Sequence, residues 1–314
     1  MTKAKFSDRL HFVTEIKSLL VGFSHSLSDF CNVKKLKGLL RLIRFELPFA
    51  AGVCVVLGQL FALGEFASVF ITAAGFLSVF LISASILVSN DYFDIETDKI
   101  NAPDRPIPSN LVSLSEALSF SIFLLIAGLA LSYLISIAAL LFSIGLAILG
   151  FLYNRKFKKH GIAGNLMVSF SVGMTVVFGG LSVGLPFNKI VLFFAVIAAL
   201  IDLGEEIAAD SMDVKGDMLI DSNSIAIKFG KEAAIKISVR IFFLVILLSL
   251  IPFILNWFTV IYLIPIGIMD TSIAYSSLKL LKAEGEDGRR YIRNLYLGAT
   301  LGLVVFLVMR LLGI

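Results

Sequence analysis

The stretch A-S-V-F-I-T-A-A-G-F-L-S-V-F-L-I-S-A-S-I-L-V-S-N-D-Y-F-D-I-E-T-D occupies residues 67–98 and joins two unlike parts. Its first part, residues 67–89, is apolar and carries no charge. A helix of roughly 20 such residues can cross a bilayer. Its last part places Asp91, Asp94 and Asp98 at i, i+3 and i+7, which aligns three carboxylates on one face of a helix. The stretch therefore predicts a membrane helix that ends in an acidic row.

A second acidic string repeats this spacing at the end of another apolar run, residues 188–208. It contains Asp210, Asp213 and Asp217. Because like charges packed so closely repel, each row favours a cation between its oxygens. Carboxylate oxygens are hard ligands that suit Mg²⁺, which proteins commonly hold together with substrate phosphates. Two such rows at a membrane surface predict a magnesium-held diphosphate whose apolar tail lies in the lipid.

Composition places the whole chain in the membrane. Of its 314 residues, 58% are hydrophobic and 16% are charged, whereas a soluble domain carries about 25% charge. The predicted fold is an all-α, polytopic bundle of nine transmembrane helices around a central cavity, with a polar cap on the cytoplasmic side. The predicted spans are 46–65, 67–89, 116–133, 135–153, 164–184, 188–208, 238–254, 256–276 and 293–312.

The distribution of basic residues predicts the orientation of these spans. If the N-terminus is cytoplasmic, the cytoplasmic segments hold 25 of the 27 Lys and Arg residues and leave only Lys189 and Arg310 outside. Cytoplasmic loops carry such an excess of Lys and Arg. We therefore expect an integral protein of the cell membrane with the N-terminus and the active site cytoplasmic and the C-terminus outside. Residues 1–44 are expected to be a cytoplasmic, interfacial, amphipathic segment, and residues 45–314 the helical domain.

Other chemistries have weaker support. The three histidines lie far apart in sequence, and the two cysteines do not suggest a disulfide or a thiolate metal site. A cation-transport site would place its charges near the bilayer midplane, whereas these acids lie at one surface. Asp270 falls inside a predicted span.

Three segments resemble the UbiA superfamily of intramembrane prenyltransferases. N-D-Y-F-D-I-E-T-D-K-I-N-A-P-D-R-P-I-P-S (90–109) looks like its first aspartate-rich motif. E-E-I-A-A-D-S-M-D-V-K-G-D (205–217), followed by S-I-A-I-K-F-G (224–230), resembles the second. L-Y-N-R-K-F-K-K (152–159) with G-I-A-G-N-L (161–166) is similar to the segment after the fourth helix. The second motif departs from the pattern at Lys215, where a Glu is common.

The resemblance implies Mg²⁺-dependent transfer of a prenyl group from its diphosphate to an acceptor. By residue, it implies metal positions at Asn90, Asp94, Asp98, Asp213 and Asp217. Asp91 and Asp210 complete the i, i+3, i+7 spacing of their strings. Each of them either binds the metal through a water molecule or orients the residues that bind it. We group Asp91 with the metal ligands and Asp210 with the substrate-binding residues. Glu206 is either a support for these residues or a side chain at the membrane surface.

Phosphate groups also need cationic partners. Arg105 lies in a loop stiffened by three prolines, which could close over the substrate as a lid. The other candidates are Arg155, Lys158, Lys228 and Arg44. Anchoring at the cytoplasmic surface is an alternative role for Arg155 and Lys158. Tyr153 is predicted at the mouth of the cavity, where its ring could stabilise an allylic cation. Asp94, Asp98, Asp213, Asp217 and Tyr153 form the predicted catalytic set.

The acceptor is the least determined part of the prediction. The sequence of the first motif most resembles that of family members that alkylate a glycerol ether phosphate with a geranylgeranyl group for membrane lipid. Prenylation of an aromatic quinone precursor or a tetrapyrrole is the alternative within the family, and a transporter for anionic lipids is the alternative from another class. The expected partners are a prenyl diphosphate, a lipophilic acceptor and membrane lipids, with no nucleic acid and no obligate protein partner.

Overall fold

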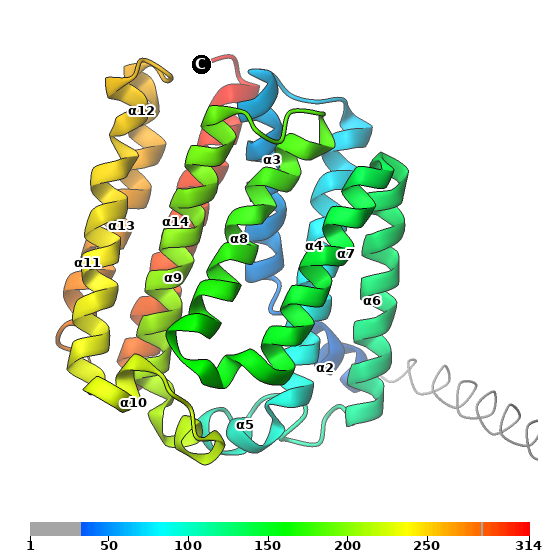
Figure 1. Ribbon diagram of the computed structural model, residues 1–314, viewed down its shortest axis with the longest axis vertical. Helices are drawn as coiled ribbons and strands as arrows, with labels where there is room; N and C mark the ends of the chain where they lie inside the picture. Colours follow the sequence, from blue (N-terminus) through cyan, green and yellow to red (C-terminus); the bar gives the residue numbers. More distant parts are fainter. Residues whose placement is uncertain (1–32, 284) are drawn as a thin grey trace, which may run out of the picture.

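The computed structural model describes residues 33–283 and 285–314, and within these ranges every regular element is a helix. Long helices run side by side and form a single bundle (Figure 1). The helices that build it are α2 (Val33–Ile43), α3 (Glu46–Leu63), α4 (Val69–Phe93), α5 (Ile95–Asn101), α6 (Leu114–Ile135), α7 (Ile137–Leu152), α8 (Ile162–Ser182), α9 (Lys189–Asp217), α10 (Ile225–Phe229), α11 (Lys231–Ser249), α12 (Ile251–Ile254), α13 (Leu263–Leu280) and α14 (Gly285–Leu311).

Eight helical segments of the described chain are long and apolar enough to cross a membrane. The predicted span at 188–208 is not among them. It corresponds to α9, a helix of 29 residues in the same bundle, whose apolar run contains Asp202, Glu205 and Glu206. The all-helical membrane fold is thus confirmed, whereas length and composition do not confirm the exact count of nine.

Serine caps define helix ends that no charge marks in the sequence. Ser136 lies between α6 and α7, and its hydroxyl accepts a hydrogen bond from the backbone N–H of Ala139. Ser113 and Glu116 form a reciprocal capping box at the start of α6. Such caps satisfy N–H groups that have no partner within the helix. They explain why the long apolar run between residues 114 and 152 folds as two helices.

α3 lies in the interior of the bundle and is packed on several sides. Its apolar side chains form a core cluster with residues of α8, α9 and α14. The helices α3 and α8 cross closely at Gly58 and Gly179. A Cβ on Gly58 would lie 2.1 Å from the carbonyl oxygen of Val176, which only a glycine avoids. Small residues allow this close approach of membrane helices.

The polar segments gather at one end of the bundle. α2, α5 and α10 lie at this end, and the C-terminus lies at the other (Figure 1). The loop after α7 is tied to the loop after α9, since the backbone N–H of Asn223 donates to the carbonyl oxygen of Lys159 at 2.9 Å. Gly161 stands at this contact with φ of 58°, and a Cβ there would meet the carbonyl oxygen of Asn223. The predicted interfacial segment at residues 1–44 is described only from Val33, where α2 begins.

Candidate active site

The first acidic string spans a break between two helices. We expected one continuous helix, but α4 ends at Phe93 and α5 begins at Ile95. Helical hydrogen bonds nevertheless continue across the break, because the N–H of Asp94 donates to the carbonyl oxygen of Asn90 and that of Asp98 to Asp94. Asp91, Asp94 and Asp98 therefore remain close together and are all buried.

The second acidic string lies on one uninterrupted helix, the polar end of α9. It faces the first string because Asn101, at the end of α5, joins the two. The side chain of Asn101 donates to the carbonyl oxygen of Asp213 at 3.2 Å and accepts from the N–H of Gly216 at 3.1 Å. Two segments far apart in the sequence thus share one polar site.

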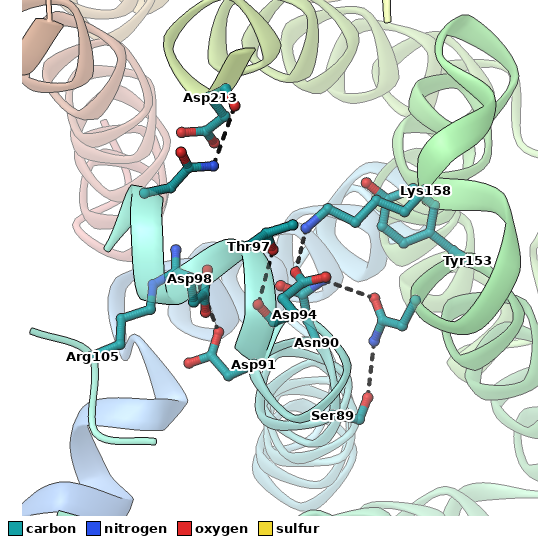
Figure 2. Close-up of polar contacts among 12 residues, drawn as sticks. Ser89, Asn90, Asp91, Asp94, Thr97, Asp98, Arg105, Tyr153, Lys158 and Asp213 are labelled. Atoms are coloured by element: carbon teal, nitrogen blue, oxygen red, sulfur yellow. Dashed lines mark hydrogen bonds and ion pairs between the residues drawn. The ribbon is translucent and has the colours of Figure 1, made fainter. Parts of the chain in front are cut away.

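Arginine side chains neutralise the first string from one side. Arg105 donates to both carboxylate oxygens of Asp98 at 2.6 Å and to Asp91 at 3.3 Å. Arg44 forms a second ion pair with Asp91. Figure 2 shows Arg105 beside Asp91 and Asp98. The proline-rich loop that carries Arg105 therefore already covers the first string.

Lys158 reaches the first string from the opposite side. Its ammonium group forms an ion pair with Asp94 (Figure 2). A π-helical turn, Tyr153–Phe157, precedes Lys158, and such turns often occur at functional sites. Tyr153 lies next to Lys158, and its hydroxyl approaches a carboxylate oxygen of Glu206 at 3.5 Å. The extra residue in this turn lets both side chains face the two acidic strings.

Two asparagine side chains orient predicted site residues, one for each acidic string. Asn154 donates to the carbonyl oxygen of Ile86 and to the hydroxyl of Ser89, both at 2.9 Å. Its own carbonyl oxygen accepts from Asn90 at 3.1 Å. Because Asn90 uses its NH₂ group in this bond, its side-chain oxygen remains available for a cation. Asn165 donates its NH₂ group to a carboxylate oxygen of Asp210 at 3.0 Å.

Burial and neighbouring charges shift the pKa values of these groups. Burial raises the pKa of Asp98, and the guanidinium of Arg105 offsets this only in part. Burial lowers the pKa of Arg105, but its carboxylate partners Asp91 and Asp98 outweigh that effect and keep the pKa above its ordinary value. At the polar end of α9, burial together with the charge of Asp210 raises the pKa of Asp217 to about 7. Negative charge is thus in excess here, which favours a divalent cation.

Comparison with known proteins identifies the family. Residues 51–307 match the model of the UbiA prenyltransferase family. The chain belongs to this family. It is 34% identical over 255 residues to the digeranylgeranylglyceryl phosphate synthase of Methanocaldococcus jannaschii, covering 81% of this chain and 89% of that protein. The synthase of Methanococcus aeolicus is 36% identical over 256 residues, covering 81% and 90%. This chain is a prenyltransferase of the UbiA type.

Solved structures agree with the fold. A structure from work on digeranylgeranylglyceryl phosphate synthase in membranes is 33% identical, covers 88% of this chain and 99% of that chain, and has a TM-score of 0.64. A UbiA homologue from Archaeoglobus fulgidus bound to GPP and Mg²⁺ is 18% identical, covers 85% and 99%, and has a TM-score of 0.58. Relatives of this fold thus bind a divalent metal with a prenyl diphosphate.

Not every predicted site residue lies within the polar cluster. Arg155 and Lys228 are exposed, and the described part of the chain shows no ion pair between either residue and the acidic strings. The sequence analysis missed Asn101, Asn154 and Arg289, of which Arg289 forms an ion pair with Asp213. Asn154 lies within the L-Y-N-R segment that carries the family resemblance, and this position was the signal that could have marked it as a site residue. Arg289 had none beyond its place in a basic stretch before the last predicted span.

The side chains of the UbiA-type site are of the chemical type that binds a magnesium ion, but they are not yet grouped around one metal position. Among the described residues, no three acidic, histidine or cysteine side chains are grouped closely enough to form such a cage. The chain's own cations instead hold Asp91, Asp94, Asp98 and Asp213. All donors are hard oxygens, the ligands that Mg²⁺ prefers. A metal with a diphosphate would let Arg44, Arg105 and Lys158 exchange carboxylates for phosphates.

Proposed function

We propose that this enzyme transfers a geranylgeranyl group from its diphosphate to a glycerol ether phosphate, in a Mg²⁺-dependent reaction of membrane lipid synthesis. The observation that carries the proposal is that two facing acidic strings lie at one site together with Arg105 and Lys158, which both pair with the first string. The names of the similar synthases support the choice of acceptor. Prenylation of an aromatic quinone precursor or a tetrapyrrole stays the alternative.

The acidic strings would hold the metal. The proposed ligands are Asn90, Asp91, Asp94, Asp98, Asp213 and Asp217. When bound, Mg²⁺ would neutralise the negative charge that develops on the leaving diphosphate. Asn154 keeps the side-chain oxygen of Asn90 available for this role. Asp210, held by Asn165, would contact the substrate.

The cationic side chains would bind the diphosphate. Arg105 and Lys158 already lie against the first string, one on each side. Arg44 would contribute from the start of α3, whereas Arg155 and Lys228 would act at the exposed rim. Phosphates accept bidentate hydrogen bonds from guanidinium groups. The diphosphate would thus remain at the polar end of the bundle, with its tail among apolar helices that exclude water.

Tyr153 would face the carbon that loses the diphosphate. The face of an aromatic ring attracts a cation, and this ring lies beside Lys158 (Figure 2). We group Tyr153 with Asp94, Asp98, Asp213 and Asp217 as the catalytic set.

The enzyme is an integral membrane protein, and its orientation forms part of the proposal. We place the N-terminus and the active site in the cytoplasm and the C-terminus outside, because the long polar loops share one end of the bundle. Residues 1–44 would lie at the cytoplasmic membrane surface before the domain of residues 45–314. In α2, Val33, Leu36 and Leu40 are exposed beside basic residues, as expected for a helix at the membrane surface.

An acceptor screen tests the proposal. Purified enzyme with geranylgeranyl diphosphate and Mg²⁺ is supplied with a glycerol ether phosphate, a hydroxybenzoate or a tetrapyrrole, and products are measured by mass spectrometry with pyrophosphate release. We expect a diether phosphate as the main product and no turnover with EDTA. Turnover of only the aromatic or tetrapyrrole acceptor would contradict the proposed acceptor. Transport of anionic lipid without any product would contradict the proposed reaction.

A further inference from the structure

A second polar pocket lies beside the acidic strings, between α3, α9 and α14. Its volume is about 280 Å³. Its polar lining comprises Glu46 of α3, Asp213 of α9, and Arg289, Arg293 and Tyr296 of α14, while Met212 and Ile292 supply apolar surface. The diphosphate site described above uses none of the three α14 side chains. The pocket therefore offers cationic groups that the proposed donor site leaves unassigned.

The three α14 residues form a row of hydrogen-bond donors. Arg289, Arg293 and Tyr296 stand at i, i+4 and i+7, which places them on one face of a helix. Two guanidinium groups one turn apart match the geometry of a phosphate, which accepts bidentate hydrogen bonds from each. The neighbouring Arg290 is exposed and does not line the pocket.

We propose that this pocket binds the phosphate monoester of the lipid acceptor through Arg289, Arg293 and Tyr296. The inference rests on the proposed function, because it assigns the acceptor's headgroup a place next to the reacting groups. Met212 and Ile292 would contact the apolar part of that lipid. Asp213 joins the pocket to the second acidic string, so the two substrates would lie on opposite sides of one carboxylate.

The charged side chains of the pocket pair with one another, and a bound phosphate would have to replace these ion pairs. Arg289 pairs with Asp213, Arg293 donates to Glu46 at 2.9 Å, and the hydroxyl of Tyr296 approaches Glu46 at 3.4 Å. About a third of each side chain of the Arg289–Asp213 pair is exposed. A divalent cation on Asp213 would release Arg289 and leave the pocket more positive. Phosphate binding is therefore expected to tighten in the presence of Mg²⁺.

A binding experiment tests the inference without relying on turnover. The probes are a 1-O-alkylglycerol phosphate and the same alkylglycerol without its phosphate, each titrated against detergent-solubilised, full-length protein by calorimetry. Wild-type protein should bind the phosphorylated probe at least about 10-fold more tightly, and more so with Mg²⁺, since hydrogen bonds to charged groups are stronger than those between neutral groups. R289Q and R293Q should each lose most of this preference while affinity for the unphosphorylated probe stays within about 2-fold, and R290Q is the matched control.

Two results would overturn the inference. One is equal wild-type affinity for both probes, and the other is a loss of phosphate preference in R290Q as large as in R293Q. Failure of the proposed function would look different, because the wild-type protein would then retain the Arg-dependent binding preference yet form no diether product. R293Q carries extra weight, since its side chain does not contact the second acidic string and its effect cannot arise from a changed metal site.

Discussion

Individual carboxylates in the two acidic strings differ sharply in their surroundings. Asp94 is buried and pairs with Lys158, and Asp213 pairs with Arg289, whereas Glu96 is exposed and pairs only with Lys99 in the same turn. The first string therefore buries some of its acids and leaves Glu96 in solvent. This difference separates residues expected to act on the substrate from residues that only decorate the surface.

Asp94→Asn and Asp213→Asn should each reduce kcat at least about 100-fold, because each removes a negatively charged metal ligand next to the diphosphate. Turnover with geranylgeranyl diphosphate, together with thermal unfolding in detergent, checks this. Glu96→Gln is the matched control and should retain near wild-type activity. Wild-type kcat in both site variants would show that the strings play no part in the reaction.

Asn154→Ala should weaken Mg²⁺ activation roughly 10–100-fold, because residues that orient metal ligands affect metal affinity to this extent. The side chain of Asn90 would lose its partner and turn freely. The measurement is the Mg²⁺ concentration at half-maximal rate. An unchanged value with lower kcat would place Asn154 in a purely structural role.

At the scale of helices, the sequence predicted most of the elements and none of the local irregularities. Apolar length and the absence of charge located α3, α4, α6, α7 and α8 to within about four residues. The end of α9 and the starts of α11, α13 and α14 lie seven to nine residues from the predicted ones. The break at Asp94 and the π-helical turn at Tyr153–Phe157 were not predictable from spacing, since both arise from how loops pack at the polar end. Ion pairs such as Arg289–Asp213 join residues 76 positions apart, and no local pattern encodes such a contact.

The crossing of α3 and α8 is the close contact on which the bundle interior depends. Gly58→Ala should lower the free energy of unfolding by about 1–3 kcal/mol, because its Cβ would overlap the backbone of Val176. Gly145→Ala in α7 is the control, since no atom lies within 4 Å of a Cβ added there. Thermal unfolding of both variants in detergent provides the comparison. Equal stability of the two would contradict the close crossing.

At the scale of the whole molecule, the polar groups lie at one end and the apolar surface surrounds the rest. Phe187, in the link before α9, is exposed at the end opposite the acidic strings, whereas Ser109 is exposed in the proline-rich loop beside them. This asymmetry follows the excess of Lys and Arg in one set of loops, which is why the sequence predicted it.

The proposed orientation can be tested by cysteine labelling in intact cells, in a background with the native cysteines replaced. Phe187→Cys should react with a membrane-impermeant maleimide added outside. Ser109→Cys should react only after the membrane is permeabilised. The reverse pattern would place the active site outside.

The central claim is that the two acidic strings act as one metal site for a prenyl diphosphate. The most direct test is a crystal structure with Mn²⁺ and a non-hydrolysable prenyl diphosphate analogue, with the metal located by anomalous scattering. We predict metal peaks between Asp94 and Asp98 on one side and Asp213 and Asp217 on the other, with Arg105 and Lys158 moved onto the phosphates. Metal and diphosphate bound away from one of the two strings would contradict the account.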